Sequence, residues 1–226
     1  MTPKQKPCHL FRYEFLILNG LRKSLGRAVE RELRFRHGLT LLDLGSQNPE
    51  YLHLFQGKAG QMVRLDIVKS TGIDVLGYGE QLPLKDQSMD VILCTQVLEH
   101  VRQPFEVVKE MHRVLKKGGM VFLTTHGNWR IHNEPEDNWR FTPDGFRELF
   151  KDYGTMRIEN QVGTLASLIQ WFNIYVKWIP RPGFLSQTLW HLFKAPFYVL
   201  PNVLGLLLDQ PRQQSFCVNY LVTARK

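Results

Sequence analysis

Two carboxylates stand at the ends of short apolar runs, where parallel strands would bring them close together. Asp43 closes the run LTLLDL, and Asp66 closes QMVRLD further along the chain. Ligands of open α/β sheets bind across the carboxyl ends of the strands, and an acid after the second strand is placed to hold a ribose. The pair therefore predicts a site for a ribose-containing cofactor.

The loop after Asp43 argues against a dinucleotide. Gly45 is present, but Gln47 and Pro49 occupy positions where further glycines would let a pyrophosphate approach the backbone. A cofactor without phosphates tolerates their loss better. A nucleotide-dependent oxidoreductase is therefore the less favoured alternative.

The elements that must position these acids follow from the apolar pattern. Short apolar runs alternate with segments of helical period, which predicts a Rossmann-like α/β fold. We expect a mostly parallel seven-stranded sheet with right-handed crossovers, an antiparallel last strand and helices on both faces. Strands are expected at 39–45, 61–66, 72–76, 89–96, 120–126, 155–162 and 215–225, and helices at 10–36, 104–116, 142–153 and after the N-cap candidate Asn48. Gly118 and Gly119 are expected to end the helix that begins at Pro104.

We divide the single domain of residues 1–226 into four parts. A basic amphipathic helix occupies 1–37, the cofactor-binding core 38–163, a helical cap inserted before the last strand 164–213, and that strand 214–226. The 29 Lys and Arg against 21 Asp and Glu give a formal charge of +8. Residues 1–37 carry nine basic residues against three acids and 151–226 carry eight against three, so 38–150 is mildly acidic. This distribution disfavours nucleic acid as a partner.

Cysteine usage and hydropathy bound the compartment. The three cysteines are far apart and lack metal-ligand spacing, so we expect a reducing, cytoplasmic environment. We find no secretory leader and no charge-free apolar run of about 18 to 20 residues that would form a membrane span.

A family resemblance rests on residues 38–126. The string IDVLGYGEQLPLKDQSMDVILCTQVLEHVRQPFEVVKEMHRVLKKGGMVFLTT resembles the core of class I S-adenosylmethionine-dependent methyltransferases of the type-11 group. The following HGNWRIHNEPEDNWRFTPDGFRELF is similar to a subgroup associated with bacterial surface-glycan biosynthesis. The resemblance implies S-adenosylmethionine as cofactor and methyl transfer as activity.

The resemblance also implies roles for individual residues on the cofactor side. Asp43, Gly45 and Ser46 would contact the amino-acid part of the cofactor, Asp66 the two ribose hydroxyls, and Ile67 the adenine. Gly79 and Glu80 would lie beside the adenine ring, and Thr95 and Gln96 beside the methionine part. Gln47 and Tyr78 complete the set of residues expected to contact the cofactor, although both depart from the family pattern. The family frequently has Asp where this chain has Tyr78.

The acceptor side is expected in the polar loop after the fifth strand. An oxygen acceptor must lose a proton, and His132, His126 and Asp137 are the candidate bases. A metal site formed by these three residues matches no compact ligand spacing, so we expect none. His100, Trp139 and Arg140 are candidate substrate contacts, and the alternative for each is a purely structural role, such as packing, anchoring the loop or pairing with a nearby acid.

The apolar segment from Leu165 to Leu208 has two interpretations. Its helices could cover the catalytic face as a lid, or they could lie in a membrane interface and receive a lipid-linked acceptor. Pro180, Pro182, Pro196 and Pro201 are expected to interrupt any span.

These observations predict methyl transfer from S-adenosylmethionine to an acceptor, with a saccharide or lipid-linked glycan hydroxyl first among them. Two alternatives stay open: a non-catalytic Rossmann-like binding module, and a small-molecule or lipid methyltransferase at the membrane surface. The sequence predicts a cytoplasmic protein, with peripheral contact to the inner membrane face through its cap, and it leaves the oligomeric state open.

Overall fold

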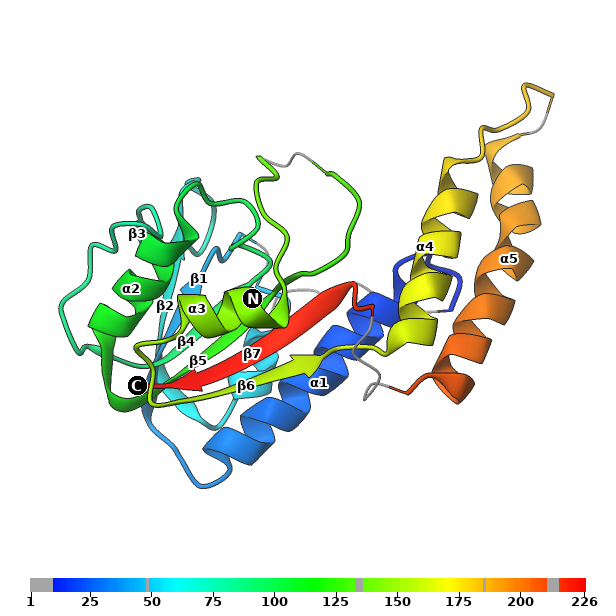
Figure 1. The fold of residues 1–226 in the computed structure, drawn as a ribbon. Helices are drawn as coiled ribbons and strands as arrows, with labels where there is room; N and C mark the ends of the chain where they lie inside the picture. Colours follow the sequence, from blue (N-terminus) through cyan, green and yellow to red (C-terminus); the bar gives the residue numbers. More distant parts are fainter. Residues whose placement is uncertain (1–9, 48, 133–135, 185, 211–215) are drawn as a thin grey trace.

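A computed structural model describes residues 10–47, 49–132, 136–184, 186–210 and 216–226 (Figure 1). The strands are β1 (Leu39–Leu44), β2 (Ala59–Asp66), β3 (Val75–Leu76), β4 (Met89–Thr95), β5 (Leu115–His126), β6 (Thr155–Asn160) and β7 (Asn219–Arg225). The helices are α1 (Phe15–Leu33), the single 3₁₀ turn η1 (Leu52–Phe55), α2 (Pro104–Val114), α3 (Pro143–Leu149), α4 (Thr164–Trp178) and α5 (Gln187–Leu208).

All seven strands form one sheet in the order β3-β2-β1-β4-β5-β7-β6. The pairs from β3 to β5 are parallel, and β7 runs antiparallel to both of its neighbours. The predicted mixed sheet with a reversed last strand is confirmed. The loops that follow β1, β2, β4 and β5 therefore leave the same edge of the sheet, which is the edge where ligands of such folds bind.

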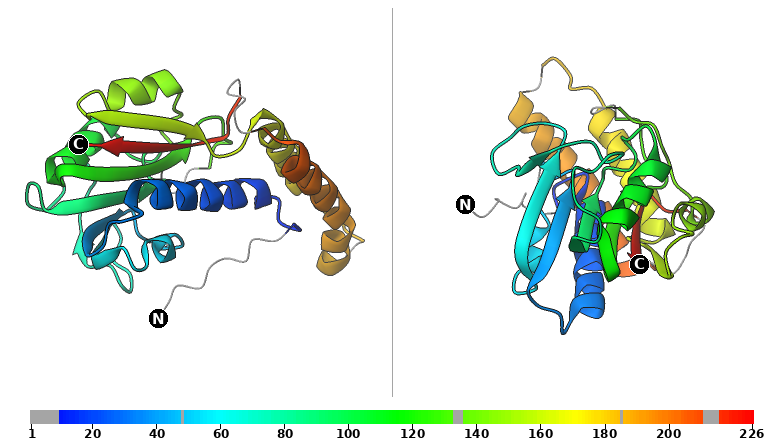
Figure 2. Two further views of the ribbon diagram at one scale, coloured as in Figure 1. Left: turned by 90° about the horizontal axis from the view of Figure 1, so that it is seen from below. Right: turned by 90° about the vertical axis from the view of Figure 1, so that its left-hand side faces the viewer.

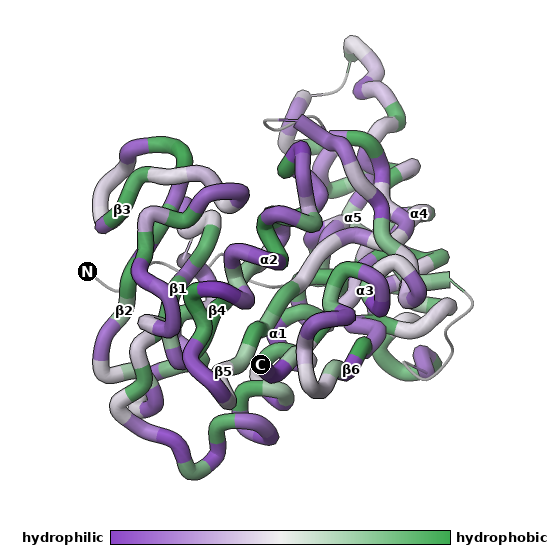
Figure 3. The backbone as a smooth tube through the Cα atoms, turned by 60° about the vertical axis from the view of Figure 1, so that its left-hand side comes forward, coloured by the Kyte–Doolittle hydropathy of each residue, from purple (hydrophilic) through white to green (hydrophobic). Residues whose placement is uncertain are grey.

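Helices cover both faces of the sheet (Figure 2). On one face α1 and η1 pack on the strands, so that Leu25 lies in one cluster with Leu41. On the other face α2 and α3 do the same, and Val108 lies in one cluster with Leu42. Neighbouring residues of β1 thus point to opposite helical layers, as strand geometry requires. The hydrophobic stretches along the strands can be followed in Figure 3.

Several boundaries differ from the sequence prediction: the first helix and the helix after Thr142 are shorter, and the last strand begins only at Asn219. Two further differences change the elements themselves. The segment after Pro49 forms only the 3₁₀ turn η1 in place of an α-helix, and Asn48 lies outside the described residues. The second helix ends at Val114 rather than at the glycine pair, because Leu115 already has extended backbone and pairs with Met89 of β4. Gly118, at φ +73°, lies inside β5, where its left-handed backbone accompanies the shift in strand register.

Helices α4 and α5 pack on each other as a hairpin beside the sheet, and their contacts with the rest of the chain include α1 (Figure 1). The helical insertion predicted before the last strand is therefore present. The prediction that the prolines interrupt this segment is wrong for Pro196 and Pro201, which lie inside the 22-residue helix α5. Each proline removes one intrahelical hydrogen bond, and the remaining bonds carry the helix through.

The sequence-based expectation of no span-length segment also needs correction. Within the described ranges, α5 is the one helix whose length and apolar composition meet the criteria for a membrane span. Only 22% of its most apolar window is buried within the protein. Length and composition alone leave open whether such a helix crosses a bilayer, lies on one or packs against protein.

Candidate functional site

The loop after β1 approaches the neighbouring loop closely at Gly45. Its backbone has φ +78°, and a Cβ at this position would lie 2.2 Å from Cγ2 of Val97. Ser46 follows, with its hydroxyl donating to Oδ2 of Asp43 and accepting from Nε of Arg64 at 2.8 Å. This chain of hydrogen bonds fixes the loop over the end of β1.

Asp43 lies beneath this loop and is 3% exposed. Burial raises the pKa of its carboxyl group to about 6, although the Ser46 hydrogen bond and the charge of Arg64 act in the opposite direction. The structure therefore gives Asp43 a positioning role toward Ser46. Arg64 was not foreseen from the sequence, where nothing distinguishes it from other strand arginines.

Asp66, at the end of β2, accepts two backbone amides. Oδ2 accepts from the amide of Gln47 at 3.0 Å, and Oδ1 accepts from the amide of Val68 at 2.9 Å. Each carboxylate oxygen keeps a second lone pair for a ribose hydroxyl. The Gln47 amide is already bonded to Asp66, so the loop does not offer it to a pyrophosphate, which fits the departure from the dinucleotide pattern.

An exposed apolar pair stands beside Asp66. Ile67 is 52% exposed and Tyr78 is 69% exposed, both unusually open for side chains of this kind. Tyr78 belongs to a tight turn in which it pairs with Gln81, and Gly79 in that turn packs close to Val107. The two side chains can provide apolar surface for a flat ring.

Glu80 and the end of β4 complete the expected cofactor positions. An oxygen of Glu80 accepts from the amide of Arg102 at 3.3 Å. Thr95 ends β4, and Gln96 follows in left-handed conformation at φ +55°. The Gln96 amide group donates to Oγ1 of Thr124 at 3.0 Å and to Oδ1 of Asn219 at 3.2 Å, so its side chain is fixed between β5 and β7.

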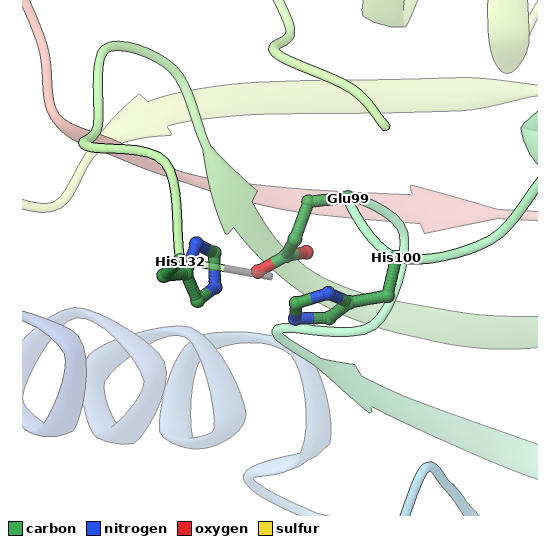
Figure 4. Close-up of side chains that lie close together, drawn as sticks. All are labelled: Glu99, His100 and His132. Carbon is green, nitrogen blue, oxygen red and sulfur yellow. The ribbon is translucent and has the colours of Figure 1, made fainter. Parts of the chain in front are cut away.

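Five ionisable side chains meet on the acceptor side of this edge, and we call them the Glu99 cluster: Glu99, His100, His126, His132 and Asp137. Glu99 and His100 come from the loop after β4, whereas His132 comes from the loop after β5. In Figure 4 the side chains of these three residues converge from the two loops. One potential ligand atom from each of the three lies within 4.8 Å of the other two.

Glu99 is the central residue and was not among the predicted site residues. It is fully buried, and its Oε2 accepts from Oγ1 of Thr125 at 2.6 Å. Oε1 lies 3.4 Å from Nε2 of His126 and has no hydrogen-bond partner among the described residues. Burial raises the pKa of this carboxyl group, so the site strongly favours a proton or a cation near Oε1.

Burial favours the neutral form of two histidines of the cluster, His126 and His132. Burial lowers the pKa of His126 well below its ordinary value, and it lowers the pKa of His132 in the same direction. His126 is 6% exposed and stacks on Trp129 with ring centroids 5.2 Å apart. A neutral imidazole can accept a proton at neutral pH, which a general base requires.

Asp137 is oriented by its neighbours rather than left open. It accepts from both terminal nitrogens of Arg140, which hold the pKa of its carboxyl group well below the usual range. Its Oδ2 also accepts from the backbone amide of His132 and lies 3.3 Å from Nδ1 of that ring. Asp137 therefore orients His132, and its strong pairing makes it a poor proton acceptor.

The three candidate substrate contacts are engaged with the protein itself. Nε1 of Trp139 donates to the carbonyl of Val101 at 2.9 Å, and Arg140 donates further to the carbonyls of Trp129 and Arg130. Nδ1 of His100 bonds to the carbonyl of Glu136. These contacts anchor the loop across the site, and of the three residues Trp139, at 38%, is the most exposed.

The cluster could also hold a metal ion. Carboxylate and neutral imidazole are suitable ligands for Zn²⁺ and related ions. The set that converges is Glu99, His100 and His132, which differs from the set of His126, His132 and Asp137 weighed from the sequence. The other role of the cluster, accepting a proton from an acceptor molecule, requires a neutral histidine and no metal ion.

Comparisons with known proteins relate this chain to methyltransferases. Residues 42–123 match the methyltransferase-domain family of the type-11 group. A thiol S-methyltransferase of Rattus norvegicus is 35% identical over 119 residues, 47% of this chain and 46% of that protein. A ubiquinone biosynthesis O-methyltransferase of Vibrio atlanticus is 36% identical over 87 residues, 38% of this chain and 33% of that protein. The chain spans less than half the length of these curated relatives.

Solved structures show the same fold. A SAM-dependent methyltransferase from Archaeoglobus fulgidus superposes with a TM-score of 0.55 at 15% identity, covering 95% of this chain and all of that one. A phosphoethanolamine N-methyltransferase of Haemonchus contortus, in complex with S-adenosyl-L-methionine, gives 0.60 at 12% identity over 96% of this chain and 56% of that one. The chain thus has the class I methyltransferase fold, with a methyltransferase-domain sequence across residues 42–123.

Proposed function

We propose that this protein is an S-adenosylmethionine-dependent methyltransferase. The observation that carries the proposal is Asp66, whose buried carboxylate ends β2 beside the exposed side chains of Ile67 and Tyr78. A carboxylate next to an apolar platform suits a ribose that bears an adenine. The family match and the relatives named as methyltransferases support the same cofactor.

The residues at the carboxyl edge fit this cofactor in chemistry. Asp66 would accept the two ribose hydroxyls, Ile67 and Tyr78 would pack on the adenine, and Glu80 would flank it. The loop that Asp43 and Ser46 hold would face the methionine part, with Thr95 and Gln96 on its other side. The bound cofactor supplies an activated methyl group, and the protein must align an acceptor with it.

The Glu99 cluster would remove the acceptor's proton. His132 is the base we favour, because its ring is neutral and Asp137 lies 3.3 Å from Nδ1. In the tautomer that carries its proton on Nδ1, on the side of Asp137, Nε2 would be free to accept the acceptor's proton. His126 offers a second neutral imidazole, with its Nε2 3.4 Å from Oε1 of Glu99.

The acceptor we propose is a hydroxyl of a saccharide or of a lipid-linked glycan. The exposed face of the Trp139 ring can stack on a sugar. The sequence of residues 126–150 resembles the subgroup associated with bacterial surface-glycan biosynthesis, which supports the same acceptor. A small-molecule thiol is the second candidate, since curated relatives include thiol S-methyltransferases. We propose that the protein acts in the cytoplasm, at the inner face of the membrane.

Two measurements test the proposal. Calorimetric titration should show saturable binding of S-adenosylhomocysteine and no binding of NAD. If S-adenosylhomocysteine does not bind up to millimolar concentration, the proposal is wrong. Incubation with radiolabelled S-adenosylmethionine and fractionated extracts should then label the saccharide or lipid fraction. Label in a thiol fraction would establish the second acceptor, and binding without transfer into any fraction would leave a non-catalytic binding module.

A further inference from the structure

The α4–α5 hairpin presents its apolar side chains to solvent in regular stripes. On α4 and just beyond its end, the exposed apolar positions follow the helical period: Leu168, Phe172, Tyr175 and Ile179. On α5 the exposed stripe comprises Leu189, Phe193, Phe197, Leu200, Leu204 and Leu207. Steps of three and four residues place each set along one side of its helix. In a water-soluble helix such a stripe faces the core.

The buried side of the hairpin contains bonded polar groups beside the apolar Ala166, Ile174 and Val176 of α4. Nδ2 of Asn173 on α4 donates to Oδ1 of Asn202 on α5 at 2.9 Å, and both residues are fully buried. The buried amine of Lys194 donates to the carbonyls of Lys177 and Ile179, the last turn of α4 and the residue after it. Buried Gln170 donates to the carbonyl of Tyr13 at 2.8 Å. The hairpin thus buries several bonded polar groups while many of its large apolar side chains face outward.

An outer face with so many exposed apolar side chains is stabilised by an apolar environment. Soluble monomers rarely expose contiguous apolar surface over the length of two helices, because each exposed side chain forfeits the free energy of its burial. Polar groups that bond each other inside a helix pair are the arrangement expected where the surroundings cannot accept hydrogen bonds. The outer face of the hairpin therefore has the character of a surface that contacts an apolar partner.

The charge of the hairpin indicates which apolar environment this is. Residues 164–208 contain Lys177, Arg181 and Lys194 and neither Asp nor Glu. These three cations and Arg12 line a cavity of about 840 Å³ near the tip of the hairpin, together with the rings of Trp178 and Trp190. Among the residues that the structure describes, no carboxylate lines this cavity, although Arg12 at its edge pairs with Glu14 at 3.3 Å. Cations and tryptophans at the edge of an apolar surface match the phosphate and interfacial layers of a bilayer.

We propose that the α4–α5 hairpin docks on the surface of an anionic lipid bilayer. Its apolar stripes lie in the interfacial layer, and the exposed Lys177 and Arg181 beside the cavity face the lipid phosphates. The hairpin lies on the membrane and does not cross it: α4 has 15 residues, about 22 Å of helix, against a hydrocarbon core of about 30 Å. The far end of α5 is also packed on α1, where Gly205 lies against Leu16.

The proposal does not depend on methyl transfer, and vesicle sedimentation tests it directly. The full chain should pellet with mixed phosphatidylcholine–phosphatidylglycerol vesicles and bind pure phosphatidylcholine several-fold more weakly. In the double variant Phe184→Ser with Leu200→Ser, affinity for the mixed vesicles should fall by at least about ten-fold, since two exposed apolar anchors, 87% and 63% open, are lost. Asp66→Ala should leave vesicle binding unchanged, because Asp66 lies outside the hairpin.

A matched control removes exposed apolar side chains elsewhere. Phe35→Ser with Phe105→Ser replaces rings that are 85% and 52% exposed outside the hairpin, and its vesicle affinity should stay within two-fold of the wild type. Circular dichroism confirms that each variant keeps its helix content. The proposal is overturned if the wild type stays in the supernatant with the mixed vesicles, or if both double variants bind equally. It is overturned as well by a dimer that the hairpin variant converts to monomer, since a second copy would then cover the face.

Discussion

Replacing Asp66 by Asn should separate cofactor recognition from the integrity of the fold. The substitution keeps the shape of the side chain and one carbonyl oxygen, but it removes the negative charge and turns one acceptor into a donor. In the wild type the two oxygens accept the amides of Gln47 and Val68. One of these amides would then face another N–H group, so either Gln47 in the loop after β1 or Val68 after β2 loses its hydrogen bond to residue 66.

The expected loss of affinity follows from the ribose. Two ribose hydroxyls donating to one carboxylate are charge-assisted hydrogen bonds, each contributing about 1.5 to 3 kcal/mol. Asn removes the charge from both and the acceptor from one, for a net loss of about 3 kcal/mol. This loss corresponds to an increase of about 150-fold in the Kd for S-adenosylhomocysteine.

Asp74→Asn is the matched control for that measurement. Oδ2 of Asp74 accepts the backbone amide of Arg64 at 2.8 Å, so it has the same kind of bond at an exposed position. Isothermal titration of both variants with S-adenosylhomocysteine, with thermal unfolding as the check on folding, should show the loss for Asp66→Asn alone. A Kd within about three-fold of wild type for Asp66→Asn, or an equal loss for Asp74→Asn, would refute the assignment of Asp66 to the ribose.

Three further predictions concern stability. Because burial raises the pKa of Glu99, the native state keeps a proton there that ionisation removes as the pH rises, so Glu99→Gln should raise Tm by a few degrees at pH 8 and less toward pH 5; a lower Tm at pH 8 would contradict this. Gly45→Ala should cost about 1 to 3 kcal/mol more than Gly38→Ala in denaturant unfolding, because both have positive φ but only the former meets Val97, and equal losses would show that the clash is absent. Chelation by EDTA should leave Tm unchanged, and a drop restored by Zn²⁺ would identify the Glu99 cluster as a metal centre.

The sequence specified the sheet and the acids at its edge well, because both depend on local pattern. Apolar runs define the strands, and an acid at the end of such a run reaches the ligand edge whatever the rest of the chain does. The strands at Asp43 and Asp66 lie where the pattern placed them. The boundary at Leu115 was missed because it depends on pairing with β4, which no local propensity records.

The acceptor side was less predictable because it forms from two loops. Glu99 belongs to a short motif in the sequence, and nothing local distinguishes it from a solvated helix-start acid. Its burial arises only when the loop after β5 folds back, so that the amides of Asn138 and Trp139 donate to the Glu99 carbonyl. The same fold-back joins Arg140 to Asp137 and commits both side chains to each other.

Periodicity also failed to say which side of the hairpin faces inward. The stripe from Leu168 to Ile179 has the spacing of a core-facing helix, yet it is exposed, and the buried side of α4 mixes polar residues such as Gln170 and Asn173 with apolar ones such as Ile174. A helical period shows that the two faces of a helix differ in hydrophobicity. The elements that pack against the helix decide which of the two faces is buried.

Trp129 connects the α4–α5 hairpin to the Glu99 cluster by direct packing. One face of its ring stacks on His126, and the residue also packs against the apolar cluster that includes Phe15 of α1 and Ala166 of α4. A truncation that deletes 164–208 removes one wall of this support and frees the His126 ring to turn. Loss of activity in such a truncated protein would report a misplaced histidine and not a missing anchor, so point substitutions on the outer stripes are the sound way to dissect the two roles.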